Sequence, residues 1–185
     1  MSVKIFIDQG HNPKNPNSGA EGNGYQEAVL MYPIGIMLKD MLNGTEGFEA
    51  ITSRNAPDEI LGTSNSSSLA QRANAANAWG ADYFVSLHAN ASTNSAAKGS
   101  EGYVYSLSSK ATGLARSMLE GLFEATGTVS RGVFARPTLY VLRKTKMPAT
   151  LLELGFITNP EQARAMADEP QKYAMGLYNG IRAYF

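Results

Sequence analysis

The chain has 185 residues, of which 43% are hydrophobic and 17% are charged. A chain of this length can form one domain that buries about 70% of the surface exposed by its unfolded form, so we expect a single domain over residues 1–185. The 16 basic and 16 acidic side chains balance, which argues against nucleic acid or an anionic membrane as a partner. There are no cysteines, so disulfides and thiol nucleophiles are excluded, and any metal must bind histidine or carboxylate side chains.

The first predicted element is a buried strand at residues 3–7, an apolar run closed by polar loop residues. This run is too short for the apolar region of a signal peptide or for a membrane span, so we expect no self-directed export. Residues 12–24 are rich in Asn, Pro, Gly and Ser and predict a loop. Residues 25–42 predict a helix with Glu27 in its first turn, in which Pro33 implies a kink or a later start.

Further along the chain, strands and helices continue to alternate. Serines before residue 69 can cap a helix over residues 69–79, and Gly80 follows its end. Later strands are predicted at residues 83–88, 102–105, 139–142 and 150–154, and later helices at residues 111–125, from Asn159-Pro160 onward, and at 170–185. This order predicts a layered α/β domain, with helices on both faces of a mostly parallel or mixed sheet.

Three polar residues lie at the carboxyl ends of predicted strands, where sites gather in α/β folds. They are His11, His88 and Glu153, and the chain has only two histidines. One histidine alone is more often structural, but two in matching positions favour a shared site. A catalytic zinc has three protein ligands and an open position for water, and two histidines with one glutamate form an established set. Glu27 is a candidate third ligand, because the first turn of a helix can point back toward strand ends. The wide spacing of the three is a weak motif by itself.

Glu153 is flanked by apolar residues that would raise the pKa of its carboxyl group. A raised pKa suits a general base or acid acting beside a metal. The alternative is a buried salt bridge to an arginine such as Arg72 or Arg143.

Four segments together resemble the zinc-dependent N-acetylmuramoyl-L-alanine amidases of the amidase-3 type. They are IDQGHNP (residues 7–13), GYQE (24–27), SLHANA (86–91) and MPATLLELGFITN (147–159), in this order and spread over essentially the whole chain. The resemblance implies Zn²⁺ on His11, Glu27 and His88, with Glu153 as the catalytic carboxylate. It also implies a mixed sheet of about six strands flanked by helices. The family commonly has PGHG where this chain has QGHN, a change beside the ligand rather than at it.

The implied substrate bond is the amide between N-acetylmuramic acid and the L-alanine of the peptidoglycan stem peptide. Zinc would polarise the carbonyl and lower the pKa of its water toward about 7, while Glu153 takes the proton and returns it to the leaving amine. The expected partner is therefore peptidoglycan, and the expected state is a monomer. We expect action at the bacterial wall, either by a holin-released endolysin or by a module of a secreted wall protein such as an autolysin.

Supporting roles remain open for several residues. Asp8 could accept the second ring N–H of a zinc-bound histidine, or cap a loop. Asn90 could bind substrate amides or stabilise a turn. The segment 131–143, with Arg131, Arg136, Tyr140 and Arg143, could line a substrate groove or form a solvated surface.

Two other functions compete with the amidase. A zinc peptidase acting on stem-peptide bonds could use the same four residues, and identification of the new termini separates the two activities. A binding module that keeps the fold without turnover would be indicated if Glu153→Ala left wall lysis unchanged.

Overall fold

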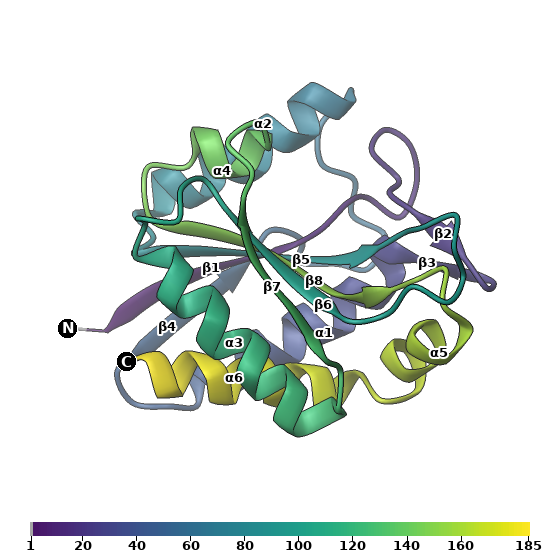
Figure 1. The fold of residues 1–185 in the computed structure, drawn as a ribbon. Coiled ribbons are helices and arrows are strands. Elements are labelled where there is room, and N and C mark those ends of the chain that lie inside the picture. The colour runs from purple at the N-terminus through teal and green to yellow at the C-terminus, as the bar shows by residue number, and fades with distance from the viewer. Residues whose placement is uncertain (1) are drawn as a thin grey trace.

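A six-stranded sheet forms the centre of the computed structural model, which describes residues 2–185 (Figure 1). The strand order is β4-β1-β5-β8-β6-β7; β6 runs antiparallel to β8, and all other neighbouring pairs are parallel. The strands are β1 (Val3–Gln9), β4 (Phe48–Thr52), β5 (Tyr83–Asn90), β6 (Ser100–Val104), β7 (Ser130–Ala135) and β8 (Ala149–Phe156). The mixed, mostly parallel sheet predicted from the sequence is confirmed.

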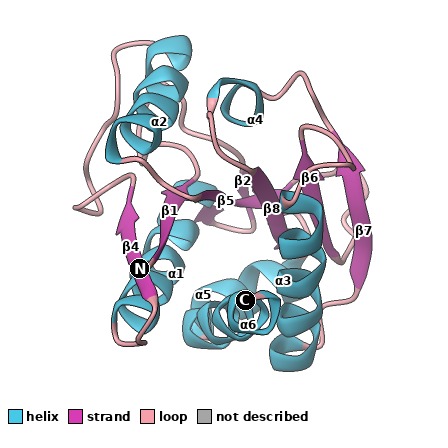
Figure 2. Cartoon of the chain, turned by 90° about the vertical axis from the view of Figure 1, so that its left-hand side faces the viewer, coloured by secondary structure: helices cyan, strands magenta, loops and turns pink. Residues whose placement is uncertain are grey.

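Helices cover both faces of this sheet, as predicted (Figure 2). Helices α2 and α4 lie on one face, and α1, α3, α5 and α6 lie on the other. Their bounds are α1 (Glu27–Asn43), α2 (Asn65–Trp79), α3 (Ala111–Thr126), α4 (Tyr140–Lys144), α5 (Pro160–Asp168) and α6 (Pro170–Tyr184). Within residues 2–185, no helix combines the length and the apolar character needed to cross a lipid bilayer.

Alternation along the strands divides the buried side chains between two cores. On β1, Ile5 and Ile7 join the larger core under α1, α3 and α6, whereas Phe6 joins the smaller core under α2 and α4. On β5, Val85 packs with the larger core and Phe84 with the smaller one. Because side chains of a strand alternate between faces, Asp8 on β1 and Ser86 and His88 on β5 lie on the same face as Phe6 and Phe84, toward α2.

Local signals placed several helix ends correctly, but α2 begins at Asn65, four residues before the predicted start at residue 69. The side chain of Ser64 accepts a hydrogen bond from the Ser67 backbone N–H in a capping box at the start of α2, and Gly80 ends that helix in a left-handed conformation. The side chain of Asn159 caps α5 as predicted. Helix α1 begins two residues later than the predicted range and continues through Pro33.

The predicted strand at residues 139–142 is wrong, because helix α4 begins at Tyr140. This short apolar run has no periodicity that separates a strand from a buried helical turn. Its residues Val141 and Leu142 pack into the smaller core beside α2. The strands β4 and β7 were not predicted. Strand β7 lies at the edge of the sheet and is largely exposed, so it lacks an apolar run.

Helices α3 and α6 pack so closely that Gly180 has no room for a side chain. A Cβ atom there would lie 2.4 Å from both the Met118 Cα and the Ser117 carbonyl oxygen. We predict that Gly180→Ala lowers the free energy of unfolding by about 1–3 kcal/mol, as overpacking does elsewhere, measured by urea denaturation. The control Asn179→Ala changes an exposed neighbour and should stay within about 0.5 kcal/mol. Equal urea midpoints for Gly180→Ala and Asn179→Ala would contradict the close packing of α3 against α6.

Candidate metal centre

His11, Glu27 and His88 meet at the carboxyl edge of the sheet. His11 follows β1, Glu27 is the first residue of α1, and His88 lies on β5. One potential ligand atom from each residue lies within 4.8 Å of the others. The Glu27 carboxylate lies between the two rings, with Oε1 2.8 Å from His88 Nδ1 and Oε2 3.4 Å from His11 Nε2. The structure therefore brings together the three side chains that the sequence suggested as metal ligands.

The hairpin of β2 (Glu21–Gly22) and β3 (Tyr25–Gln26) delivers Glu27 to this place. The hairpin leads directly into α1, and the Glu27 N–H donates to the Ala20 carbonyl. Two backbone N–H groups fix the carboxylate: that of Ala20 donates to Oε2 at 2.9 Å, and that of Ala89 donates to Oε1 at 3.0 Å. The buried carboxylate also lies at the positive end of the α1 dipole.

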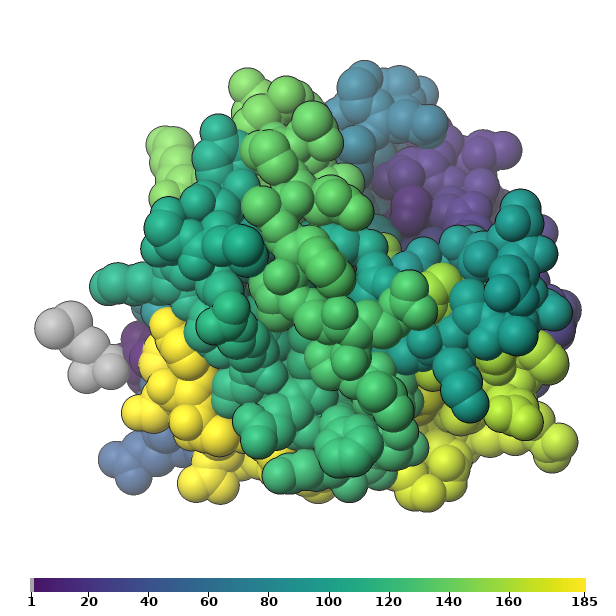
Figure 3. Space-filling view, in the orientation of Figure 1, coloured from purple at the N-terminus to yellow at the C-terminus, as the bar shows by residue number. Residues whose placement is uncertain are grey.

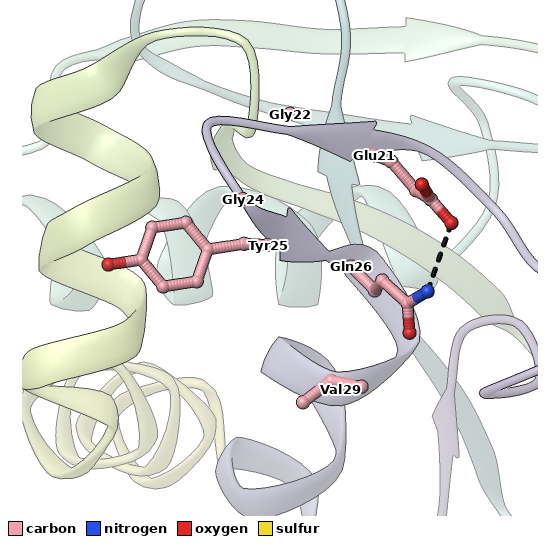
Figure 4. A pocket seen from close by; sticks show the side chains of 6 residues that line it. All are labelled: Glu21, Gly22, Gly24, Tyr25, Gln26 and Val29. Carbon is pink, nitrogen blue, oxygen red and sulfur yellow. Dashed lines mark hydrogen bonds between the residues drawn. The ribbon is translucent and has the colours of Figure 1, made fainter.

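The outer side of the hairpin borders a hollow of about 620 Å³ (Figure 4). Figure 4 shows Tyr25 and Gln26 pointing in opposite directions, with the Gln26 side chain donating to Glu21 at 3.0 Å. His11, His88 and Glu153 do not line this hollow. This hollow is therefore not the site of the chemistry, despite its volume.

His11 depends on an unusual backbone conformation and on a neighbouring glycine. Its φ angle is 65°, in the left-handed region that few residues other than glycine adopt. Arg72 donates to its carbonyl oxygen at 2.6 Å and holds the loop in place. A Cβ atom on Gly19 would lie 2.6 Å from the His11 ring and 2.9 Å from Glu27 Oε2. Only glycine therefore allows this loop to pass so close to both side chains.

The charges of the three residues are strongly coupled. Burial by itself would raise the pKa of Glu27, but the hydrogen bond and charge of His88 and the charge of His11 outweigh it and bring the pKa to about 2. Burial would lower the pKa of His88, and its contact with Glu27 overrides this and raises it. Burial and the charge of His88 lower the pKa of His11. The Glu27 carboxylate is thus ionised and positioned to share a cation with two imidazoles.

Glu153 lies beside the three residues on the adjoining strand. The strand register pairs it with His88 on β5 and with Glu101 on β6. Its Oε2 atom is buried and finds no hydrogen-bond partner among residues 2–185. Burial raises the pKa of Glu153 to about 7; the charge of His88 opposes this shift, and the charges of Glu27 and Glu101 add to it. It can therefore take up and release a proton near neutral pH.

Neither arginine considered as a salt-bridge partner pairs with Glu153. Arg72 is buried and donates instead to Asp8 Oδ1 at 2.6 Å. Arg143 is exposed on α4, and no salt bridge between it and Glu153 occurs in the described part of the chain. The salt-bridge alternative for Glu153 is therefore wrong.

The role of Asp8 differs from both alternatives considered for it, whereas Asn90 takes one of its two. Asp8 has Ser86 between it and His88: Ser86 Oγ donates to Asp8 Oδ2 at 2.7 Å and lies 3.0 Å from His88 Nε2. The sequence reasoning missed Ser86, although alternation along β5 places it on the same face as His88. Asn90 accepts the Ala91 backbone N–H at 2.8 Å, which is the turn-stabilising role.

A cavity of about 290 Å³ opens over the site, lined by both histidines and Glu153. From the segment 131–143, Leu139, Tyr140 and Val141 reach this cavity. Arg131 instead pairs with Glu101, and Arg136 lies over the Tyr103 ring at 5.3 Å. Green atoms of β7 and the residues after it form much of the face seen in Figure 3. The segment thus contributes mainly apolar and aromatic side chains to the cavity, and its arginines lie outside the lining.

Comparisons with known proteins identify the family. The family model described as N-acetylmuramoyl-L-alanine amidase matches residues 5–183. The chain belongs to this amidase family. It is 36% identical over 187 residues to the N-acetylmuramoyl-L-alanine amidase CwlM of Bacillus licheniformis, a match that covers 99% of this chain and 69% of that protein. An endolysin of Bacillus phage SPP1 is 33% identical over 167 residues, covering 88% of this chain and 58% of the endolysin.

A solved member of the amidase family has the same fold. The catalytic domain of CwlV, an N-acetylmuramoyl-L-alanine amidase from Bacillus (Paenibacillus) polymyxa var. colistinus, superposes with a TM-score of 0.84 at 31% identity. The superposition covers 98% of this chain and 97% of that domain. The amidase fold thus extends over nearly the whole chain, including all four residues of the site.

The raised pKa of Glu153 predicts a pH-dependent stability of metal-free protein. Between pH 4.5 and about 7 the folded state keeps a proton that the unfolded chain releases, so the free energy of unfolding falls as pH rises through this range. We predict that Glu153→Gln removes this loss and stabilises the chelator-treated protein by up to about 3 kcal/mol at pH 8, with little effect at pH 4.5. Urea denaturation at both pH values measures the difference.

The control is Glu120→Gln, which neutralises an exposed glutamate on α3. It should show no comparable gain at pH 8. A Glu153→Gln variant no more stable than this control at pH 8 would contradict the raised pKa.

Proposed function

We propose that the chain is a zinc-dependent hydrolase that cleaves the amide between N-acetylmuramic acid and the L-alanine of peptidoglycan stem peptides. His11, Glu27 and His88 hold the metal in this proposal, and Glu153 is the catalytic base and acid. The observation that carries it is the Glu153 carboxyl group, which has a pKa of about 7, has no Lys or Arg salt bridge among residues 2–185 and shares one cavity with His11 and His88. Membership of the amidase family supplies the bond that is cleaved.

The donor set fits zinc. Two imidazole nitrogens and one carboxylate oxygen form an established ligand set for catalytic zinc, which keeps a fourth position for water or substrate. Glu27 Oε1 and His88 Nδ1 form a 2.8 Å hydrogen bond, and a cation bound by both atoms would take the place of its proton. When bound, zinc lowers the pKa of water and polarises the substrate carbonyl.

Glu153 performs both proton transfers. Its ionised carboxylate accepts a proton from the attacking water, whose oxygen forms a new bond to the lactyl carbonyl carbon. The carbon–nitrogen bond then breaks, and Glu153 returns the proton to the departing nitrogen of L-alanine. The products are a lactyl carboxylate on the sugar and a free amino group on the stem peptide. A pKa near 7 suits a group that must both accept and donate the proton.

The proposed setting is the bacterial wall, with peptidoglycan as the macromolecular partner. The relatives include a phage endolysin and bacterial amidases, so both an endolysin and a bacterial wall enzyme fit the family. We propose that residues 1–185 act as one catalytic domain and as a monomer. The aromatic and apolar lining from Tyr103, Leu139 and Tyr140 is suited to contact with sugar rings and with the alanine methyl group.

Product analysis tests the reaction. Purified peptidoglycan digested by the zinc-loaded protein should gain free L-alanine amino termini while the stem peptides remain intact. Glu153→Gln should reduce this release by about 10²–10⁴-fold, because the proton transfers lose their carrier. Its zinc content should stay at one per chain, and Glu120→Gln should behave like the parent. New amino termini inside the stem peptide would instead support the peptidase, and unchanged release by Glu153→Gln would overturn the role of Glu153.

Metal removal tests the cofactor. Treatment with a chelator should abolish the release of L-alanine termini, and added Zn²⁺ should restore it, because in this mechanism the metal activates both the water and the carbonyl. His11→Ala should lower the zinc content of the purified protein, as measured by atomic absorption. Cleavage that persists at full rate without metal would contradict the mechanism.

A further inference from the structure

A buried chain of hydrogen bonds lies behind His88 and runs through Ser86 and Asp8 to Arg72. We propose that Ser86 is a positioning residue that keeps the ring proton of His88 on Nε2, so that Nδ1 is the atom offered to the metal. His11 offers the opposite nitrogen, Nε2, so the two histidines bind as different tautomers. This inference rests on the proposed metal site and adds to it the residues that set its geometry.

The direction of the hydrogen bonds starts at Arg72, which can only donate. Its Nη1 atom lies 2.6 Å from Asp8 Oδ1, in a pair whose side chains are 1% and 2% exposed. A carboxylate paired with a guanidinium so closely is ionised and can only accept. Ser86 Oγ, 2.7 Å from Asp8 Oδ2, must therefore donate its single proton to Asp8.

The orientation of Ser86 then decides the tautomer of His88. A serine hydroxyl has one proton, and that of Ser86 is already given to Asp8. At the 3.0 Å contact between Ser86 Oγ and His88 Nε2, the serine oxygen must accept, so Nε2 carries a proton. Without metal, Nδ1 can donate a second ring proton to Glu27 Oε1 at 2.8 Å, and loss of that proton leaves the Nδ1 lone pair for a metal. A metal cation at this point satisfies both the nitrogen and the carboxylate oxygen.

The two ring nitrogens of His11 have the opposite roles from those of His88. Its Nε2 atom is the one that faces Glu27, and its Nδ1 atom lies 2.9 Å from Asn17 Oδ1, which can accept the ring proton. Arg72 links the two sides, because it donates to the His11 carbonyl as well as to Asp8. One buried guanidinium thus holds the loop of His11 and orients the hydrogen-bond chain of His88.

Zinc affinity tests the role of Ser86. We expect Ser86→Ala to weaken Zn²⁺ binding about 10–100-fold, as loss of a partner behind a metal-bound histidine does elsewhere, measured by competition with a chromophoric chelator. The matched control is Ser100→Ala, which removes another fully buried strand serine whose hydroxyl has no partner among residues 2–185. Its affinity should stay within about twofold of the parent. Equal affinities for the two variants would overturn the positioning role.

The tautomers can be read directly in the unaltered protein. The chain has two histidines, so long-range ¹H–¹⁵N spectra of the zinc-loaded, ¹⁵N-histidine-labelled protein contain only two rings. We expect one ring protonated on Nε2 and the other on Nδ1, assigned to His88 and His11 with His11→Ala as the reference. A proton on Nδ1 of His88 would overturn the inference even if Ser86→Ala fails to fold. A parent protein that binds no Zn²⁺ would instead overturn the proposed metal site, which separates the two failures.

Discussion

The parallel pairing of β1, β5 and β8 is the constraint on which the site depends. In this register Asp8 lies beside Ser86, and His88 lies beside Glu153. Alternation along each strand points these four side chains toward the same face, under α2 and α4. A shift of one residue in any of the three strands would turn its polar group into the larger apolar core. The packing of that core therefore also fixes the geometry of the chemistry.

The site separates two glutamates by their surroundings. Glu27 receives two backbone N–H groups and faces two imidazoles, and its pKa falls to about 2 despite burial. Glu153 Oε2 has no hydrogen-bond partner among residues 2–185, and burial raises the pKa of Glu153 to about 7. Two carboxyl groups whose pKa values are shifted in opposite directions can perform different tasks in one site. One carboxylate is suited to hold a cation permanently, and the other is suited to exchange a proton with water.

Much of this arrangement could be predicted because it depends on local pattern. Apolar runs indicated the three central strands, and the carboxyl ends of parallel strands share one edge, so His11, His88 and Glu153 were expected to lie together. The role of Glu27 depended more on resemblance, since the hairpin that delivers it consists of two very short strands without a distinct pattern. Helix α4 was predicted as a strand because four apolar residues fit either structure.

The contacts that support the site could not be predicted from local sequence patterns. Arg72 was considered as a partner of Glu153, yet it pairs with Asp8, 64 residues away in the chain. The choice between two buried carboxylates depends on how α2 lies over the sheet, which local propensity does not specify. Asn17 reaches His11 through a loop in which both residues have positive φ angles, a path set by tertiary contacts. Ser86 alone could have been found, from its position two residues before His88 on the same face.

The most direct test of the account is a crystal structure of the zinc-loaded protein, with anomalous differences recorded on both sides of the zinc absorption edge. We predict one zinc peak within about 2.0–2.2 Å of His11 Nε2, a Glu27 carboxylate oxygen and His88 Nδ1, with the Glu153 carboxylate nearby but not bound to the metal. A zinc peak elsewhere, or no zinc peak between these three residues, would contradict it.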